Sequence, residues 1–434
     1  MANVIYRKAA LEGSVVLPPS KSAAHRAVLC AALSRGRCRI SNLDLSEDLR
    51  ATISAVEALG AVTRYSADSG SLEIDAQSLG KREARLPCGE SGSTLRFLIP
   101  IAAALGTAAV FTGEGRLPQR PLGVYTELLP EHGIEVETEG GLPLKIKGQL
   151  RGGTYVLPGN VSSQFITGLL FALPLLPEDS ELRLSSPLES KGYVDLTCGM
   201  LRQFGIRMEE TEWGWRIPGG QKYLPHDYRV EADWSQAAFF LCMAALAPGG
   251  KVLKLKGLRE DSLQGDKACA ALFRQFGLTV EFSDGVLKAW NPHAGKPFSG
   301  LRGFTIDAAQ IPDMVPALSV CAALAQGQTR IVHAERLRLK ESDRLAAMAN
   351  AIHALGGRAE ATADGMNIEG VPFLKGGTAC GVNDHRVVMA LAAAALKSEG
   401  PVEVTDAWSI RKSYPGFFQD YQKLGGTADV VDLG

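Results

Sequence analysis

The chain has 434 residues, of which 46% are hydrophobic and 21% are charged, the balance of a soluble globular protein long enough for two or more domains. Its formal net charge of −1 at pH 7 gives no overall drive toward nucleic acid or an anionic membrane. Any anion site therefore needs a local cluster of Lys and Arg.

The sequence also lacks the features of membrane, secreted and metal-binding proteins. No apolar stretch reaches the roughly 18 residues of a membrane span, and the N-terminus "MANVIYRKAALEG" lacks the pattern of a secretory signal. The eight cysteines show neither metal-ligand nor disulfide-framework spacing. We expect a protein of the reducing cytoplasm without a metal site.

The first notable element is the stretch "LPPSKSAAHRAVLCAAL" at residues 17–33. Two prolines precede Ser20, which can cap an apolar helix. Lys21, Ser22 and Arg26 then lie near its start, where free N–H groups and the helix dipole favour an anion. An ordinary cap with two solvated charges is the alternative.

The same order of polar loop, apolar helix, turn and strand occurs six times along the chain. Its marker residues follow one another at spacings of 71, 71, 71, 80 and 71 residues. The markers are Ser20, Ser91, Ser162, Asp233, Asp313 and Asp384. A second helix in each repeat ends in glycine, as in "SAVEALGAVTRY", which suits the left-handed turn after a helix. The period exceeds that of solenoids, so we expect six α/β units.

The first helix of each repeat is apolar nearly all round, which predicts that it is buried. If these helices run parallel, their polar N-termini meet at one end and their dipoles add. Cations are placed at these starts and in nearby loops, and solvated surface positions are the alternative for each one. They are Lys21, Arg26, Arg96, Arg120, Lys340, Arg344, Arg386 and Lys412.

Two carboxylates accompany the cations. Asp313 in "QIPDMVPAL" is either a proton acceptor or a helix cap. Glu341 is either a proton-transfer group or an i,i+3 partner of Arg344. The chain has no G-x-x-x-x-G-K-[ST], G-x-G-x-x-G or G-x-S-x-G motif. We expect an enzyme that binds anions directly, without metal or cofactor.

Nine segments together resemble the 5-enolpyruvylshikimate-3-phosphate synthases, also called 3-phosphoshikimate 1-carboxyvinyltransferases. They are "PPSKSAAHR", "GESGSTLRF", "QRPLG", "VSSQF", "ESKGYVD", "IPDM", "LKESDRL", "NDHRV" and "RKSYPG", in family order. The resemblance implies an α/β fold of two globular domains, each with three βαβαββ units and buried parallel helices, an inside-out α/β barrel. Residues 16–229 would form an inserted domain that binds shikimate 3-phosphate. Residues 1–15 and 230–434 would form the domain for phosphoenolpyruvate and the catalytic carboxylates, with closure over the cleft.

The resemblance also implies a reaction and its residues. Members join phosphoenolpyruvate to the 5-hydroxyl of shikimate 3-phosphate through a tetrahedral intermediate and release phosphate. Asp313, Glu341, Lys21 and Lys412 match catalytic positions. Shikimate 3-phosphate contacts match Lys21, Ser22, Arg26, Ser162, Ser163, Gln164, Ser190, Tyr193, Asp313 and Lys340. Phosphoenolpyruvate contacts match Lys21, Gly92, Arg120, Gln164, Arg344, His385, Arg386 and Lys412.

Two positions depart from the family pattern. Glu90 and Arg336 each stand where many relatives have Asn, which adds a negative charge at one place and a positive charge at the other. Gly92 keeps the small side chain that, in the family, leaves room for the herbicide glyphosate.

Two rival interpretations remain open. The related transferase of UDP-N-acetylglucosamine uses a loop cysteine, and "GEGRLPQRPLG" has none. A non-catalytic anion-binding relative would have lost proton-transfer groups, whereas Lys21, Asp313, Glu341 and Lys412 are all present. We expect a cytoplasmic monomer whose partners are small-molecule substrates, not nucleic acid or membrane.

Overall fold

The computed structural model describes residues 2–432, which divide into two compact units. One is Pro19–Glu231, and the other is Met1–Pro18 with Ala232–Gly434. The sequence-based borders after residues 15 and 229 lie three and two residues away from these. We call the two units the inserted unit and the terminal unit.

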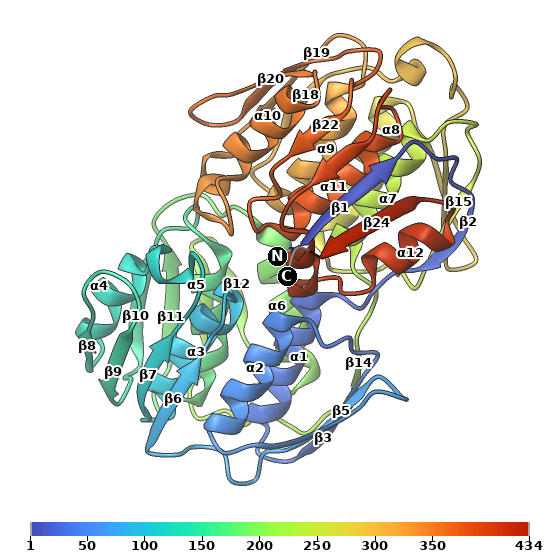
Figure 1. Ribbon diagram of the computed structural model, residues 1–434. Helices are drawn as coiled ribbons and strands as arrows, with labels where there is room; N and C mark the ends of the chain where they lie inside the picture. Colours follow the sequence, from blue (N-terminus) through green and yellow to red (C-terminus); the bar gives the residue numbers. More distant parts are fainter. Residues whose placement is uncertain (1, 433–434) are drawn as a thin grey trace. The chain divides into compact units, whose positions relative to one another are not determined.

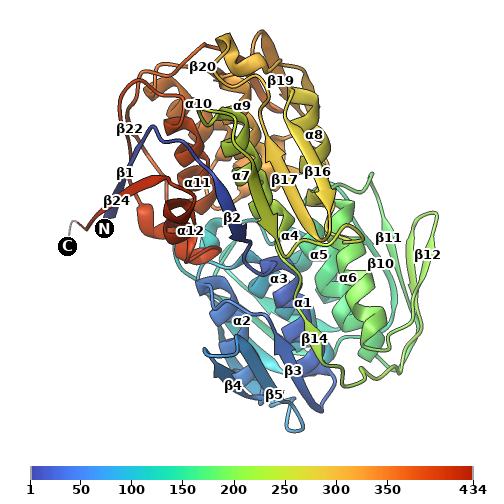
Figure 2. The same cartoon turned by 90° about the vertical axis from the view of Figure 1, so that its right-hand side faces the viewer.

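Within residues 2–432, six four-stranded sheets, three in each unit, repeat one topology. In each sheet an edge strand runs parallel to the second strand, and the remaining pairs are antiparallel, as in β6-β7-β9-β8. In four of the six sheets a buried helix supplies the crossover that the parallel pair needs, which gives a βαβαββ unit. In the other two sheets the parallel partners are far apart in sequence: Tyr228–Arg229 pairs with Arg37–Ser41, and Gly13–Val16 pairs with Leu253–Lys256. This confirms the α/β fold class expected from the sixfold pattern (Figures 1 and 2).

The strands of the inserted unit are β3 (Arg37–Ser41), β4 (Val62–Ser66), β5 (Ser71–Asp75), β6 (Glu83–Pro87), β7 (Ala108–Thr112), β8 (Ile134–Glu137), β9 (Leu144–Gly148), β10 (Gly153–Leu157), β11 (Ser180–Leu184), β12 (Glu209–Thr211), β13 (Gly214–Ile217) and β14 (Tyr228–Arg229). Those of the terminal unit are β1 (Ala2–Arg7), β2 (Gly13–Val16), β15 (Leu253–Lys256), β16 (Thr279–Ser283), β17 (Val286–Trp290), β18 (Thr305–Asp307), β19 (Gln328–Val332), β20 (Arg358–Ala361), β21 (Met366–Glu369), β22 (Gly377–Ala379), β23 (Val402–Val404) and β24 (Thr427–Asp432).

The two ends of the chain join one sheet. Strand β1 lies between β23 and β24 and is antiparallel to both, so it takes the place that β9 has in its sheet. Strand β14, at the end of the inserted unit, pairs in parallel with β3 at its beginning. In each unit, therefore, strands from the beginning and the end of the unit's sequence pair in one sheet.

The first helix of each repeat is buried, as its composition predicts. These helices are α1 (Lys21–Leu33), α3 (Gly92–Ala104), α5 (Ser163–Ala172), α7 (Trp234–Leu246), α9 (Val315–Ala323) and α11 (His385–Ala395). Every residue of α7, α9 and α11 is buried, and these three helices pack against one another (Figure 1). In the inserted unit α3 packs along α5, whereas α1 packs mainly on α2 and α6.

The second helices cover the sheets and end in glycine. They are α2 (Glu47–Ala58), α4 (Gly123–Glu131), α6 (Lys191–Gln203), α8 (Cys269–Phe276), α10 (Arg344–Ala354) and α12 (Phe417–Lys423). The glycine that follows each of them has a positive φ, between 81° and 118°. The left-handed turn expected after each of these helices is therefore present.

Five of the six marker residues cap a buried helix with their side chains. They are Ser20, Ser91, Ser162, Asp233 and Asp384. The sixth, Asp313, lies in a short 3₁₀ helix, Pro312–Met314, and α9 begins without a side-chain cap. Of the two roles considered for Asp313, the structure excludes the cap and leaves its carboxylate for other partners.

No helix within residues 2–432 has the length and apolar character needed to cross a membrane.

We expect Gly168→Ala to destabilise the protein, because a Cβ at this α5 position would lie 2.3 Å from both the Arg96 carbonyl oxygen and the Tyr125 hydroxyl. Overpacking here outweighs the better helix propensity of alanine, so the net loss should be about 2 kcal/mol in denaturant unfolding. In Gly123→Ala, the matched control in α4, the nearest atom is 3.5 Å away, and unfolding should hardly change.

Candidate active site

Lys21 begins α1 and forms an ion pair with Asp48 in the first turn of α2. The Lys21 Nζ and Asp48 Oδ2 atoms are 2.7 Å apart, and both side chains are mostly buried. Beneath them, His25, Thr52, Thr94 and Ser91 form a buried chain of hydrogen bonds across α1, α2 and α3. Burial, with Lys21 and Arg26 nearby, holds the pKa of His25 well below its usual value, so this imidazole is neutral.

Arg26 is buried among neutral acceptors. Its guanidinium donates to the Thr197 hydroxyl at 2.8 Å and to the Ser22 and Tyr193 carbonyls at 2.7 and 3.0 Å. It also lies over the Phe97 ring. Burial lowers its pKa to about 10, which still leaves it charged at neutral pH. No carboxylate contributes to these bonds, so its positive charge is available to an anion.

A second arginine of the inserted unit, Arg96, also has an amide, a carbonyl and an aromatic ring among its partners. Arg96 donates to Gln164 Oε1 at 2.7 Å and to the Pro121 carbonyl, and it lies over the Phe165 ring. Gln164 in turn donates to Ser93 Oγ at 3.0 Å. These bonds fix the amide of Gln164, a predicted site residue, between the starts of α3 and α5.

Arg120 lies directly above Gly92, the first residue of α3. A Cβ at Gly92 would be 2.7 Å from the nearest Arg120 nitrogen, so only glycine leaves this guanidinium in place. Arg120 is itself 93% buried. Nearby Glu90, the first departure from the family pattern, packs against Gly115, where a Cβ would be 2.4 Å from its carboxylate.

The predicted serine and tyrosine contacts lie at the starts of α5 and α6. Ser162 caps α5 by accepting from the Gln164 N–H, and Ser163 is buried in the first turn. Ser190 precedes α6 with a left-handed backbone, φ 54°, and Tyr193 lies in its first turn. The structure thus places the residues expected for shikimate 3-phosphate in this unit at helix starts.

In the terminal unit, Asp313 is surrounded by cations. Its Oδ1 is 2.9 Å from an Arg344 nitrogen, and its Oδ2 is 3.0 Å from an Arg386 nitrogen. Lys340 Nζ is 3.9 Å away. Burial raises the pKa of Asp313, but Arg386, Lys340 and Arg344 outweigh it and hold the pKa well below its usual value.

Arg344, at the start of α10, binds three carboxylates with a side chain that is 1% exposed. Besides Asp313, its guanidinium lies 2.8 Å from Glu341 and 2.8 Å from Asp384. The i,i+3 pairing considered for Glu341 is therefore present. Burial lowers the pKa of Arg344, but Asp384, Glu341 and Asp313 raise it above its usual value. The group is permanently charged.

Lys340 differs from the arginines because its charge is conditional. Burial lowers its pKa to about 8, and the attraction of Asp313 only partly offsets that effect. Its side chain is 23% exposed, so the ammonium can reach a ligand. A lysine with this pKa changes charge close to physiological pH.

The start of α11 and the segment after β23 supply the remaining cations. Arg386 also donates to the Ser235 hydroxyl at 3.2 Å and to the Asp313 carbonyl at 3.0 Å. Lys412 donates to the Asn383 carbonyl at 2.8 Å. His385 is buried beside Asp384, whose Oδ1 lies 4.0 Å from the His385 Nδ1.

Arg336, the second departure, is buried and donates to the backbone carbonyl of Ala309. Its positive charge also lowers the pKa of Lys340, by less than burial and the nearby Arg344 do. The substitution therefore acts on the electrostatics around Lys340.

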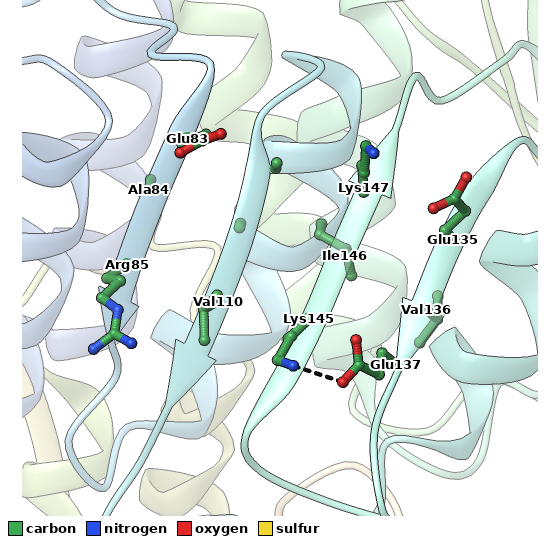
Figure 3. A pocket seen from close by; sticks show the side chains of 12 residues that line it. Glu83, Ala84, Arg85, Val110, Glu135, Val136, Glu137, Lys145, Ile146 and Lys147 are labelled. Carbon is green, nitrogen blue, oxygen red and sulfur yellow. Dashed lines mark hydrogen bonds and ion pairs between the residues drawn. The ribbon is translucent and has the colours of Figure 1, made fainter.

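A hollow of about 630 Å³ lies elsewhere, over the outer face of the sheet β6-β7-β9-β8 (Figure 3). Val110 lies among its lining residues, together with the longer side chains of Arg85, Lys145 and Glu137. Lys145 and Glu137 are paired with each other at 2.6 Å. None of the predicted site residues lines it.

Sequence reasoning missed the partners that hold the cations in place. Asp48 lies in the first turn of α2, and Asp384 caps α11. Acidic residues at helix starts beside the cations were a signal that could have identified these partners. Thr197 and Ser235 gave no signal, because their contacts with Arg26 and Arg386 join residues 171 and 151 positions apart.

Comparisons with known proteins identify the family of the chain. The family model of EPSP synthase (3-phosphoshikimate 1-carboxyvinyltransferase) matches residues 5–421. A 3-phosphoshikimate 1-carboxyvinyltransferase of Clostridium kluyveri is 43% identical, over 98% of this chain and 97% of that protein. One of Clostridium acetobutylicum is 44% identical, again over 98% and 97%.

Solved structures are similar over the whole chain. An EPSP synthase from Acinetobacter baumannii has a TM-score of 0.82 at 26% identity and covers 100% of both chains. The enolpyruvyl transferase NikO from Streptomyces tendae has a TM-score of 0.79 at 19% identity, over 99% of this chain and 98% of that one, which shows a shared fold. The six repeats therefore form an enolpyruvyl transferase fold. Within that class, the chain belongs to the EPSP synthase family. The resemblance seen in the sequence is confirmed, and the rival acceptor UDP-N-acetylglucosamine is not favoured.

We expect Arg344→Gln to destabilise the terminal unit strongly, since it removes the shared cation of buried Asp384 and of the partly buried Asp313 and Glu341. Removing one partner of a buried charge network costs about 3 to 5 kcal/mol, measurable by chemical unfolding at pH 7. Arg358→Gln, which breaks an exposed pair with Glu369, is the control and should leave the unfolding midpoint nearly unchanged.

Proposed function

We propose that this chain transfers the enolpyruvyl group of phosphoenolpyruvate to the 5-hydroxyl of shikimate 3-phosphate and releases phosphate. Relatives at 43% and 44% identity carry the name of this activity. The observation that carries the proposal in molecular terms is Asp313, a carboxylate held between two arginines and beside a lysine. The reaction needs such an arrangement, because both substrates are anions and one proton must leave the hydroxyl.

The residues divide by ligand as the family motifs imply. Shikimate 3-phosphate is bound by Lys21, Ser22, Arg26, Ser162, Ser163, Gln164, Ser190, Tyr193, Asp313 and Lys340. Phosphoenolpyruvate is bound by Lys21, Gly92, Arg120, Gln164, Arg344, His385, Arg386 and Lys412. That the residues of the two units serve one common site stays a prediction of the resemblance.

The phosphate of shikimate 3-phosphate suits the cations of the inserted unit. Arg26 donates to a hydroxyl and to two backbone carbonyls, which carry no net charge. A bound phosphate therefore gains the full attraction of the guanidinium without competing with a protein carboxylate. Hydroxyls of Ser162, Ser163 and Ser190 add donors of fixed position at helix starts.

Proton transfer falls to the carboxylates of the terminal unit. Asp313 accepts the proton of the 5-hydroxyl as the hydroxyl oxygen bonds to C2 of phosphoenolpyruvate. Glu341 donates a proton to C3 in this addition and takes a proton back from C3 in the elimination. Loss of phosphate then restores the double bond. Because the pKa of Asp313 is low, the transfer becomes favourable only as the new C–O bond forms and the hydroxyl grows acidic. The surrounding cations stabilise the intermediate's charge.

We further propose that the enzyme works as a monomer in the cytoplasm, with small-molecule substrates and no cofactor. Seven of the eight cysteines are buried thiols, which suits a reducing compartment.

The direct test mixes purified protein with both substrates, without metal or nucleotide, and follows phosphate release with product mass. We expect phosphate only when both substrates are present, together with an enolpyruvyl adduct of shikimate 3-phosphate. Turnover with UDP-N-acetylglucosamine instead, or with neither acceptor, would contradict the proposal.

Asp313→Asn should keep most substrate binding and lose about 10²-fold or more in kcat, because the amide preserves shape but cannot accept the proton. Steady-state kinetics with both substrates checks this. Asp364→Asn, at an exposed position of the same unit, is the control. An unchanged kcat would remove Asp313 as the base.

The pKa of Lys340, about 8, predicts how binding depends on pH. Lys340 is charged below this value and neutral above it, so kcat/KM for shikimate 3-phosphate should fall as pH rises through about 8. Lys340→Arg should remove this fall, because arginine stays protonated. A fall that persists in the arginine variant would assign the titration to another group.

A further inference from the structure

A strained turn lies immediately before the α11 cap. Val382 and Asn383 have φ values of 46° and 54°, so two consecutive residues that are not glycine occupy the left-handed region. Asparagine tolerates this conformation, but a β-branched valine there is a true outlier. Such strain persists only where surrounding contacts enforce it, and it gathers at functional sites.

The contacts that enforce the turn come from the segment after β23. Asp406 Oδ2 accepts a hydrogen bond from the Asn383 N–H at 3.2 Å, and Thr405 Oγ1 accepts one from the Gly381 N–H at 3.2 Å. Backbone also presses on the turn, since a Cβ at Gly381 would lie 2.2 Å from the Thr405 carbonyl oxygen. The left-handed conformation is thus built from side-chain acceptors and close packing.

The turn fixes the position of a predicted phosphoenolpyruvate residue. The Asn383 carbonyl accepts from Lys412 Nζ at 2.8 Å, and the Lys412 residue is 4% exposed. Lys412 ends the short helix Ala407–Lys412, which begins directly after Asp406. Asp406 is therefore connected to Lys412 by two routes, through this helix and through the Asn383 peptide.

The same turn leads into the charge cluster. Asp384 follows Asn383, holds Arg344 at 2.8 Å and accepts from the Arg386 N–H at 3.0 Å. A change of the Asn383 conformation would therefore displace the Lys412 acceptor first and the arginines second.

We propose that Asp406 is a positioning residue for phosphoenolpyruvate binding: it holds Val382 and Asn383 in their strained conformation and thereby fixes Lys412. The assignment rests on the proposed function, since it takes Lys412 as a contact of that substrate. Asp406 itself touches no reacting atom in this account.

Asp406→Gly tests the proposal cleanly, because glycine adopts the φ of 56° found at this position and lacks only the acceptor. KM for phosphoenolpyruvate should rise about tenfold, the effect of one charged hydrogen bond, while KM for shikimate 3-phosphate stays nearly constant. Asp406→Asn keeps an acceptor oxygen and should restore KM to within about threefold. Asp284→Gly, at an exposed turn position with φ 54°, is the matched control. Equal rises in both KM values would contradict the proposal.

Relief of the strain supplies a second readout. With Val382→Gly the turn no longer needs to be forced into the left-handed region, so the double variant with Asp406→Gly should recover most of the lost affinity for phosphoenolpyruvate. If the effects of the two substitutions on KM for phosphoenolpyruvate simply add, Asp406 does not hold the turn in its strained conformation. Asp406→Ala repeats the series should the glycine variant fail to fold.

A third readout does not depend on the reaction at all. An amine-acylating reagent with mass spectrometry reports the exposure of Lys412, with exposed Lys222 as the internal reference. Asp406→Gly should raise the Lys412 labelling rate several-fold, whether or not the chain turns over its substrates. Unchanged labelling would refute the positioning role, while raised labelling in a protein without phosphate release would refute only the proposed function.

Discussion

The buried guanidinium of Arg344 is the interaction on which the terminal unit's site depends. It is charged, 1% exposed, and bonded to three carboxylates from three different segments of the chain. Such a charge is tolerated inside a protein only when its partners are placed accurately, so it ties together the start of α10, the Asp313 segment before α9 and the cap of α11. Those ties aim Arg386 and Lys340 at the same carboxylate, Asp313.

The cations of the two units have different hydrogen-bonding partners, and the difference suits phosphate binding in one unit and proton transfer in the other. Arg26 is held by hydroxyl and carbonyl oxygens and by an aromatic face, and these contacts leave its charge to a ligand. Arg344 and Arg386 are held by carboxylates, which leave a nearly neutral cluster containing groups that exchange protons. The first environment suits tight binding of a phosphate. The second suits proton transfer beside a developing negative charge.

The sequence was enough to predict the repeated architecture, because helix caps, apolar helices and terminal glycines recur at a nearly constant spacing of 71 residues. It also pointed to the cations, since Lys and Arg at helix starts have a physical reason to be there. The resemblance placed residues 1–15 with residues 230–434, but the strand partners of β1 and β14 could not be predicted, because these pairings join segments far apart in sequence. Nor could the sequence choose between cap and acceptor for Asp313, because that choice depends on whether Arg344 and Arg386 reach it.

The carboxylates around Arg344 act as one cluster rather than as separate ion pairs. A double-mutant cycle with Asp313→Asn and Asp384→Asn, followed by denaturant unfolding at pH 7, measures this directly. We expect a coupling free energy above about 1 kcal/mol, since each substitution changes the charge that the other faces. Losses that add to within about 0.5 kcal/mol would mean that the two carboxylates act independently, and would contradict the account.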